Sequence, residues 1–331
     1  MQKVLVTGGA GYVGAHTCLR LSEAGFLPVV YDNLSNGHAE FAQWGPLEVG
    51  DIGDAARLDA VFAAHTPVAV LHFAALIEVG ESVRQPDRFY DNNVAGALCL
   101  INAARRAGVE AMVFSSTCAT YGEPQQMPMD ETHPQTPLNP YGRTKLMVEQ
   151  MLRDFDQYSG FRSVALRYFN AAGADFEGRI GEWHSPETHA IPLAIAAAQG
   201  SNAGFKVMGR DYPTRDGTAV RDYIHVLDLA EAHVLALKYL LAGGATDVFN
   251  LGTGTGSTVQ EVVDAVARVS GRPFEVADAP RREGDAPALV ADNRKAREIL
   301  GWTPRFGLSE ILESAWKWHT EGLPALQDAQ T

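Results

Sequence analysis

The sequence predicts an α/β fold, a doubly wound parallel sheet followed by a smaller mixed α/β substrate-binding domain. Three observations predict it. Short valine-rich apolar runs alternate with helical stretches through the first half of the chain, which is typical of strands buried on both faces of a parallel sheet. A glycine-rich turn follows the first run, and after about Asn170 glycine, proline and histidine become frequent.

The elements of the first half follow one another in strand–helix order. We expect a first helix from the glycine turn to about Ala24, ended by Gly25, and long helices over Asp87–Ala107 and Tyr141–Tyr158. The predicted strands are Val4–Val6, Val29–Tyr31, Val68–Leu71, Met112–Phe114 and Val164–Leu166. Residues 1–172 are therefore expected to form the first domain, with some later segments returning to it.

The second half of the chain is predicted to consist of loops interrupted by helices. Loop residues dominate Glu182–Pro192 and Gly209–Gly217, and helices are predicted near Ile191–Gln199, Leu227–Leu241 and Val259–Val269. We expect residues 173–331 to form mainly the smaller domain. It should lie over the carboxyl ends of the strands, where open α/β sheets bind their ligands.

Composition excludes several classes of partner. The net charge of −13 disfavours nucleic acid and anionic membranes, and no run of 18 apolar residues occurs that could span a bilayer. The start of the chain has no signal-peptide pattern, so a cytoplasmic location is expected. Cys18, Cys99 and Cys118 have no disulfide or metal-ligand spacing and are expected to be small buried residues, so no metal site is predicted.

The glycine turn indicates a dinucleotide site. Gly8, Gly11 and Gly14 follow the first strand and open the first helix, so that a pyrophosphate can approach the backbone at the helix N-terminus. Asp32 ends the second strand, where a carboxylate can accept hydrogen bonds from a ribose diol. An acid there can also be a simple turn residue. Because a carboxylate repels a 2′-phosphate, the pattern favours NAD over NADP.

A tyrosine–lysine pair indicates proton-transfer chemistry. Tyr141 and Lys145 are four residues apart and share one helix face. A nearby ammonium is expected to lower the pKa of a tyrosine, which can then take a proton from a sugar hydroxyl. Thr117 ends a strand about 25 residues earlier and can bond the reacting oxygen. Two residues on an amphipathic helix and a strand-end cap are the alternative explanation.

Beyond these motifs the chain resembles the extended short-chain dehydrogenases/reductases of the Rossmann type, and among them the UDP-glucose 4-epimerases. The similarity runs from Val4 to about Trp318. The most specific stretches are Tyr90–Val94, Pro140–Lys145, Leu166–Asn170, Asp211–Thr214, Val220–Val226, Phe249–Gly252 and Arg281–Asp285.

The resemblance implies a role for each matching residue. The implied catalytic residues are Tyr141, Lys145 and Thr117. The implied NAD-binding residues are Gly8, Gly11, Tyr12, Val13, Gly14, Asp32, Asn33, Asn36, Asp51, Ile52, Phe73, Ala74, Ala75, Asn93, Thr117, Tyr141, Lys145, Tyr168 and Phe169. The implied substrate-binding residues are Thr117, Tyr141, Asn170, Arg221, Arg282, Asp285 and Leu289. Guanidinium forks suit the phosphate oxygens of a nucleotide diphosphate.

The activity that the resemblance implies is interconversion of UDP-glucose and UDP-galactose with tightly bound NAD, by oxidation at C4, rotation of the 4-keto sugar and re-reduction. Alternatives are 4-epimerisation of UDP-N-acetylhexosamines or UDP-pentoses, a nucleotide-sugar dehydratase or decarboxylase, and a non-catalytic NAD-binding sensor. Dehydratases carry an acid just after the strand-end threonine, where this chain has Cys118 and Ala119.

Two positions depart from the pattern of some relatives. Ile77 stands in place of a lysine near the cofactor, and Leu289 in place of a tyrosine beside the sugar, which predicts a roomier sugar pocket. His189 and Ala190 also differ, and no role is assigned to them. The resemblance further implies a homodimer, formed through Asp87–Ala107 and Tyr141–Tyr158.

Overall fold

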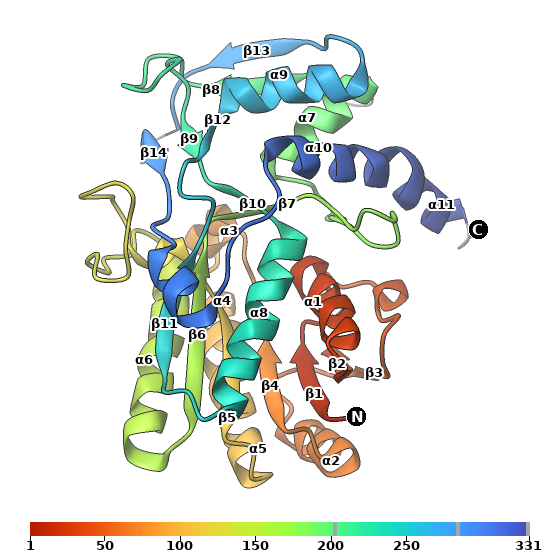
Figure 1. Ribbon diagram of the computed structural model, residues 1–331, viewed down its shortest axis with the longest axis vertical. Coiled ribbons are helices and arrows are strands. Elements are labelled where there is room, and N and C mark those ends of the chain that lie inside the picture. The colour runs from red at the N-terminus through yellow and green to blue at the C-terminus, as the bar shows by residue number, and fades with distance from the viewer. Residues whose placement is uncertain (201–203, 283–284, 329–331) are drawn as a thin grey trace.

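The computed structural model describes residues 1–200, 204–282 and 285–328, and its centre is a seven-stranded sheet in which all neighbouring strands are parallel (Figure 1). Its strands, in spatial order, are β11 (Asp247–Leu251), β6 (Arg162–Tyr168), β5 (Ala111–Thr117), β4 (Ala69–His72), β1 (Lys3–Thr7), β2 (Leu27–Asp32) and β3 (Leu47–Val49). The order reverses between β1 and β4, which is the switch point at which such sheets bind ligands. The predicted doubly wound Rossmann fold is confirmed.

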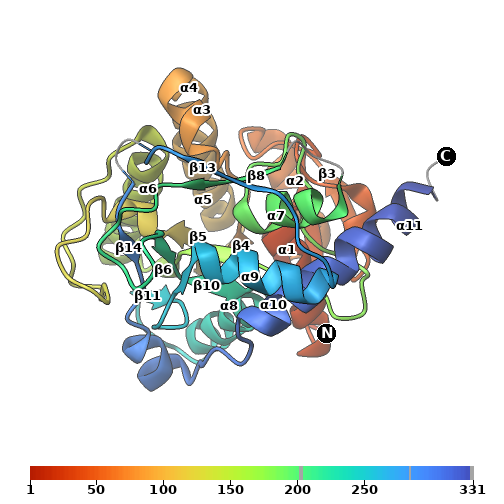
Figure 2. The same cartoon turned by 90° about the horizontal axis from the view of Figure 1, so that it is seen from above.

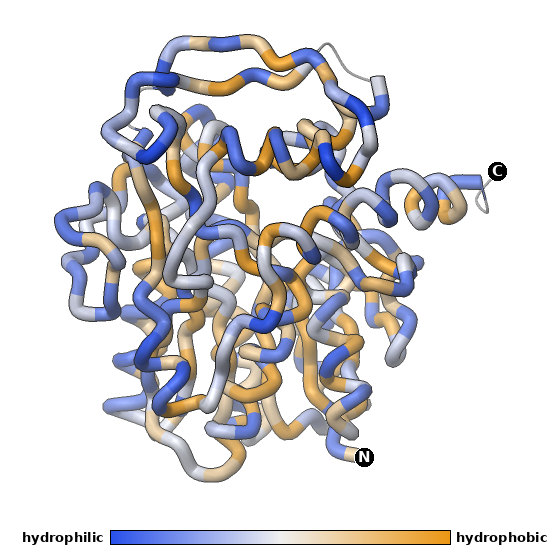
Figure 3. Tube along the Cα trace, turned by 45° about the horizontal axis from the view of Figure 1, so that its top comes forward, coloured by the Kyte–Doolittle hydropathy of each residue, from blue (hydrophilic) through white to orange (hydrophobic). Residues whose placement is uncertain are grey.

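Alternating side chains of the strands build two apolar layers, one on each face of the sheet. Val4 and Val6 point into one layer and Leu5 into the other, as the period of two in a strand requires. The first layer is completed by α1 (Tyr12–Glu23) and α8 (Val226–Leu241), and the second by α2 (Ala55–His65), α5 (Ala97–Arg106) and α6 (Pro140–Ser159) (Figure 2). Figure 3 shows apolar residues along the central strands.

The predicted helix over Asp87–Ala107 is interrupted by a π-helical segment. The chain passes from α3 (Val79–Arg84) through α4 (Pro86–Phe89) and the π-helical η2 (Tyr90–Gly96) into α5. A Cβ atom on Gly96 would lie 2.9 Å from the side chain of Ile52, so the glycine permits close packing there. Such π-helical turns are frequent at functional sites.

The smaller region lies over the carboxyl ends of the strands, as expected (Figure 1). Its third apolar cluster joins α7 (Ala190–Gln199), α9 (Val259–Ser270) and α10 (Leu308–Lys317). The remaining strands are β7 (Asn170–Ala172) paired with β10 (Tyr223–His225), β12 (Ser257–Thr258), β9 (Val220–Arg221) and β14 (Ala288–Leu289) in one small sheet, and β13 (Val276–Ala279) paired with β8 (Phe205–Met208). The remaining helical turns are η1 (Ala39–Phe41), η3 (Cys118–Thr120), η4 (Ala296–Leu300), η5 (Trp318–Gly322) and α11 (Leu323–Asp328).

The chain crosses between the two regions more than once. After β7 and the segments that follow it, α8 packs on the central sheet and β11 adds its edge strand beside β6. The division at residue 172 stays a prediction, with these later segments belonging to the central sheet. No helix in the described part of the chain is both long and apolar enough to cross a membrane.

The cysteines are free thiols, but they are not all buried. Cys18 is buried between α1 and the sheet, whereas Cys99 and Cys118 are only partly buried. The expectation of three buried residues is therefore wrong for two of them. Cys118 instead lines the pocket described next, because it directly follows β5 at the carboxyl edge of the sheet.

Candidate active site

A pocket of about 640 Å³ opens at the carboxyl edge of the central sheet. This volume is within the range of ligand sites, roughly 300–1,000 Å³. Its walls come from the glycine turn after β1, the loops after β2, β4 and β5, the end of β6, and the segment before α7. Of the residues predicted from the sequence, those that line it are Gly8, Gly11, Tyr12, Val13, Gly14, Asp32, Asn33, Asn36, Ile52, Phe73, Ala74, Ala75, Thr117, Tyr141, Tyr168, Phe169 and Asn170.

The glycine turn between Gly8 and Gly14 leaves a space beside its backbone that side chains would fill, and we call this space the cradle. Gly8 has a φ of +71°, and a Cβ atom on it would lie 2.6 Å from the backbone nitrogen of Ala74. A Cβ atom on Gly14 would lie 2.1 Å from the carbonyl oxygen of Gly8. The backbone of the turn is thereby left open beside the N-terminus of α1, which favours negative charge. These residues fit the pyrophosphate of a dinucleotide.

Gly14→Ala is expected to abolish retention of the dinucleotide. Because the added methyl group would meet rigid backbone at 2.1 Å, the turn must open and the helix N-terminus must move. We expect the purified variant to carry less than about a tenth of the wild-type NAD, since a shift of about 1.4 kcal/mol already changes binding tenfold. NAD released on denaturation measures it. Gly80→Ala is the control, because a Cβ atom there would meet only the end of the Arg84 side chain at 3.7 Å, and equal NAD in both variants would contradict the cradle.

Asp32 lies beside the turn, and backbone contacts hold it there. Its carboxylate accepts hydrogen bonds from the backbone nitrogens of Ala10 at 3.0 Å and Leu34 at 2.9 Å. Burial raises its pKa above the usual range. Asn33 also lines the pocket, and its amide donates to Asp51 at 2.9 Å. Asp51 is exposed and is not among the pocket-lining residues, although its neighbours Gly50 and Ile52 are, so its direct contact with the cofactor stays a prediction.

Asn93 acts on the loop after β4 and not on the pocket directly. Its side-chain oxygen accepts from the backbone nitrogen of Leu76 at 2.8 Å, and its amide donates to the carbonyl of Leu76 at 3.0 Å. The same amide donates to Thr144 on α6 at 3.1 Å. This residue of η2 thus ties the loop that contains Phe73–Ala75 to the helix that carries Tyr141.

The tyrosine–lysine pair is placed by the start of α6. Asn139 caps the helix by accepting from the backbone nitrogen of Gly142 at 2.9 Å, and Pro140 occupies its first turn. Tyr141 faces the pocket. Lys145 lies behind it, with Nζ 6.0 Å from the centre of the Tyr141 ring, and donates to the carbonyl of Ser115 at 2.9 Å.

Burial dominates the pKa values of this pair. The expectation that Lys145 lowers the pKa of Tyr141 is wrong for the chain by itself. Burial raises the pKa of the Tyr141 phenol above its ordinary value, although a hydrogen bond with Thr117 acts in the opposite direction. Burial also lowers the pKa of Lys145 to about 7. The lysine is therefore only partly charged near neutral pH, and further positive charge is needed before the phenol can ionise.

The buried lysine predicts a pH-dependent stability. From about 7 up to its ordinary 10.5, the folded state holds fewer protons at Lys145 than the unfolded chain does. The free energy of unfolding therefore rises with pH in this window. We expect Lys145→Met to raise the free energy of unfolding above that of the wild type by more at about pH 6.5 than at about pH 9.5. Urea unfolding of the dinucleotide-free protein measures this difference. A pH-independent difference would contradict the lowered pKa.

Successive polar side chains of β5 point to opposite sides of the strand. Ser115 and Thr117 line the pocket, and Ser115 is hydrogen-bonded to the hydroxyl of Tyr168 at 2.6 Å. Ser116 points the other way and donates to Glu149 at 2.5 Å. Thr117 accepts from the backbone nitrogen of Ala119 at 3.2 Å and so also caps the turn that follows.

A buried ion pair behind the pocket had no signal in the sequence analysis. Glu149 on α6 pairs with Arg167 on β6 at 2.5 Å, with side chains only 4% and 2% exposed. Arg167 also donates to the hydroxyl of Tyr121 at 2.8 Å, which in turn donates to Asn250 at 2.6 Å. The network links the helix that carries Tyr141 to β6 and β11.

The residues predicted to bind substrate are only partly brought together. Asn170 lines the pocket, whereas Arg221, Asp285 and Leu289 lie beyond it. Arg221 pairs with Asp285 at 2.6 Å and stands opposite Leu289 in the β9–β14 register. The side chain of Arg282 is exposed, and Glu283 and Gly284, in the same predicted stretch, lie outside the described residues. Arg221 is thus held in place by a carboxylate, and the substrate contacts of Arg221, Arg282 and Asp285 stay predictions.

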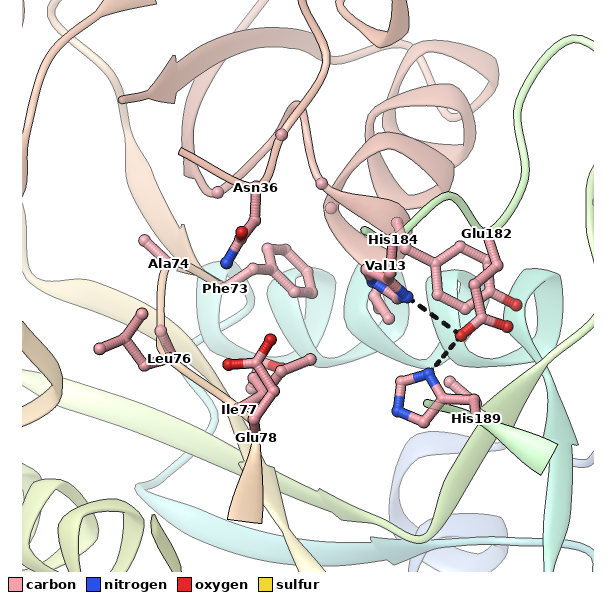
Figure 4. Close-up of a pocket in the computed structure, with 18 of the residues that line it drawn as sticks. Val13, Asn36, Phe73, Ala74, Leu76, Ile77, Glu78, Glu182, His184 and His189 are labelled. Carbon is pink, nitrogen blue, oxygen red and sulfur yellow. Dashed lines mark hydrogen bonds and ion pairs between the residues drawn. The ribbon is translucent and has the colours of Figure 1, made fainter. Parts of the chain in front are cut away.

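The four positions that depart from the pattern of some relatives fall into two groups. Ile77, Glu182, His184 and His189 line the pocket (Figure 4). Ala190 and Trp183 also line it. Residues 182–184 were predicted only as part of a loop. Leu289 packs against a small apolar cluster that contains Phe169. A signal was present for the missed residues, because glutamate and histidine alternate at positions 182, 184, 187 and 189.

The site combines a glycine cradle with a tyrosine–lysine pair at the edge of a parallel sheet of this order. This combination defines a class of protein, and comparison with known families agrees. The sequence profile of the NAD dependent epimerase/dehydratase family matches residues 4–252. The chain belongs to this family.

Several similar proteins are named UDP-glucose 4-epimerase. UDP-glucose 4-epimerase of Rhizobium leguminosarum bv. trifolii is 67% identical, over 97% of this chain and 98% of the relative. The structure of UDP-glucose 4-epimerase from Brucella ovis in complex with NAD is 50% identical, with a TM-score of 0.94 over 96% of this chain and 98% of that one. The Stenotrophomonas maltophila UDP-glucose 4-epimerase, with bound NAD and formylated UDP-arabinopyranose, is 40% identical, with a TM-score of 0.95 over 99% and 100%.

Proposed function

We propose that this chain is an NAD-dependent 4-epimerase that interconverts UDP-glucose and UDP-galactose. One observation carries the proposal: Tyr141 and Thr117 face the same pocket as the glycine cradle. A proton acceptor and a cradle that would hold a hydride-accepting dinucleotide thus border one space, as oxidation of a secondary alcohol requires. The identity with proteins named UDP-glucose 4-epimerase supports the same reaction.

In the proposed reaction, Tyr141 takes the proton of the sugar 4-hydroxyl and later returns it. Bound NAD supplies the acceptor and donor of the C4 hydride, and its oxidised ring adds positive charge to the pocket. Added positive charge favours the phenolate, which offsets the burial that raises the pKa of Tyr141. Thr117, hydrogen-bonded to Tyr141, holds the reacting oxygen, and Lys145 positions the end of β5 through the carbonyl of Ser115.

Epimerisation requires the 4-keto sugar to turn while the nucleotide stays bound. Asn170 in the pocket and Arg221 beyond it are the proposed anchors of the diphosphate. Arg221 already pairs with Asp285, so the carboxylate keeps the guanidinium in place and remains available to a ribose hydroxyl. We place the sugar against Tyr141, with few fixed contacts to its other hydroxyls.

The chain lacks the acidic residue that the dehydratase alternative requires. The residues after Thr117 are Cys118 and Ala119, which line the pocket without a carboxylate. A second substrate class is favoured by Leu289, which packs against the apolar cluster around Phe169 and offers no hydrogen bond to a sugar. We propose that N-acetylated sugars also fit. An assay with UDP-N-acetylgalactosamine checks this, and absence of turnover would refute the wider specificity but not the epimerase.

The testing experiment is incubation of the purified protein with UDP-galactose and no added NAD, followed by chromatography of the products. UDP-glucose formation supports both 4-epimerisation and retained NAD. No product with NAD added, from UDP-galactose or from UDP-xylose, would overturn the proposal.

We further propose a cytoplasmic homodimer. Leu98 on α5 and Met147 on α6 are 37% and 40% exposed, and apolar side chains on two packed helices favour a helix-bundle interface. Light scattering of the purified protein distinguishes a dimer from a monomer.

A further inference from the structure

Four side chains of types that can ligate a metal meet beside the pocket, and three of them, Glu182, His184 and His189, line it. Glu182, His184, Glu187 and His189 belong to the segment before α7, and their ligand atoms all lie within 4.8 Å of one another. In Figure 4, His184 and His189 approach the Glu182 carboxylate from two sides. The proposed epimerase reaction uses none of these four groups.

The spacing of the ligand atoms matches a metal polyhedron. The Nδ1 atom of His184 lies 3.4 Å from Glu182 and 3.6 Å from Glu187, and Nδ1 of His189 lies 3.6 Å from Glu187. Ligands about 2.1 Å from a tetrahedral Zn²⁺ are separated by about 3.4 Å. These three nitrogen–oxygen distances are too long for good hydrogen bonds. They are close to the separation of two ligand atoms around a tetrahedral Zn²⁺ ion. His189 and Glu182, at 2.5 Å, are closer and would move apart around an ion.

One ring nitrogen in the cluster is unsatisfied. Nδ1 of His184 is buried and has no hydrogen-bond partner, although it faces two carboxylates. A buried polar atom without a partner costs about 1–3 kcal/mol. A cation between the imidazoles and the carboxylates would satisfy this nitrogen.

The backbone that carries the ligands is fixed independently of any ion. The indole nitrogen of Trp318 donates to the carbonyl of Glu182 at 2.9 Å. The ring of Trp183 stacks on His38 at 3.8 Å. One carboxylate oxygen of Glu187 accepts from the backbone nitrogens of Thr188 and His189, both at 2.7 Å. The four side chains therefore lie on a segment whose backbone is fixed by other contacts, as a preorganised site requires.

We propose that Glu182, His184, Glu187 and His189 bind one divalent transition-metal ion of the Zn²⁺ class. Two imidazole nitrogens and two carboxylates are a donor set that Zn²⁺ prefers to Mg²⁺ or Ca²⁺, which take mainly oxygen ligands. Four protein ligands close the coordination sphere, so the ion is structural and fixes the wall of the pocket. The site is independent of the proposed epimerase reaction, and the alternative occupant is no ion, with the four side chains paired among themselves.

The test is metal binding by the full-length protein after chelator treatment. Reloading with Co²⁺ is expected to give about one equivalent per chain with the intense visible spectrum of tetrahedral coordination. Zn²⁺ is expected to displace it. Glu182→Gln and His184→Asn should each weaken binding more than about 100-fold, since even residues that only orient ligands contribute about 10–100-fold. His65→Asn is the matched control, because His65 pairs with Glu48 at 2.7 Å outside the cluster.

A second measurement on the wild-type chain covers variants that fail to fold. Zn²⁺ should protect His184 and His189 from diethyl pyrocarbonate, as read by peptide mass spectrometry, and leave His65 unchanged. Absence of stoichiometric Co²⁺ binding, or equal modification of these histidines with and without Zn²⁺, would overturn the site whatever the activity on UDP-galactose. A Co²⁺ spectrum of thiolate type would also overturn it, by assigning the ion to a cysteine.

Discussion

Tyr141→Phe is expected to lower the turnover of UDP-galactose by about 100- to 10,000-fold, the range that general acid–base groups contribute. The change removes one oxygen atom from a side chain that faces the pocket. It leaves the cradle at Gly8–Gly14 and the α6 cap intact, so NAD content should stay near that of the wild type. The rate is measured by chromatography of UDP-glucose formed.

Tyr158→Phe is the matched control, since Tyr158 lies near the other end of the same helix and is 78% exposed. It should keep full activity. If Tyr141→Phe kept more than about a tenth of the wild-type rate, the tyrosine would not be the principal acid–base group. If it lost NAD as well, the defect would be one of binding.

Arg167→Met is expected to lower the free energy of unfolding by about 3–5 kcal/mol, the usual cost of removing one partner of a buried ion pair. Glu149 would remain as a charge 4% exposed, with the hydroxyl of Ser116 as a donor. The hydroxyl of Tyr121 would also lose its contact with Arg167. Urea unfolding monitored by tryptophan fluorescence measures the change.

Arg106→Met is the comparison for this prediction. Arg106 pairs with Asp59 at 2.8 Å, but the two side chains are 51% and 49% exposed, so the loss should stay within about 1 kcal/mol. The double variant Glu149→Leu with Arg167→Met should recover part of the stability, because no charge is left buried. Equal losses for Arg167→Met and Arg106→Met would contradict the importance of burial.

The sequence was informative wherever a local pattern decides the structure. Alternation of Val4, Leu5 and Val6 between two apolar layers is a property of the strand itself. The glycine spacing and the Asn139–Pro140 helix start are likewise short-range signals, and the structure has both where the sequence places them. The π-helical segment within Asp87–Ala107 was not predicted, and the close packing of Gly96 against Ile52, far away in the chain, was not visible in the sequence.

Features that depend on distant contacts were missed for the same reason. Glu149 and Arg167 are ordinary charged residues in the sequence, and only the packing of α6 on β6 buries them. The pKa of Tyr141 was predicted in the wrong direction, because the sequence shows its distance from Lys145 along the helix but not the burial of both groups. The role of Arg282 stays a prediction, since its side chain is exposed whereas Arg221 is tied to Asp285.

The edge strand β11 constrains how this protein can be made. Because Asp247–Leu251 completes the sheet beside β6, a nascent chain that has emerged from the ribosome only to Ala172 lacks both its last strand and the helix α8 that covers one face. The β6 edge and residues such as Val164 and Leu166 would then face water until about 80 further residues were translated. Expression of residues 1–172 alone should therefore yield aggregates, and chaperone capture during synthesis should end once residue 251 is clear of the exit tunnel.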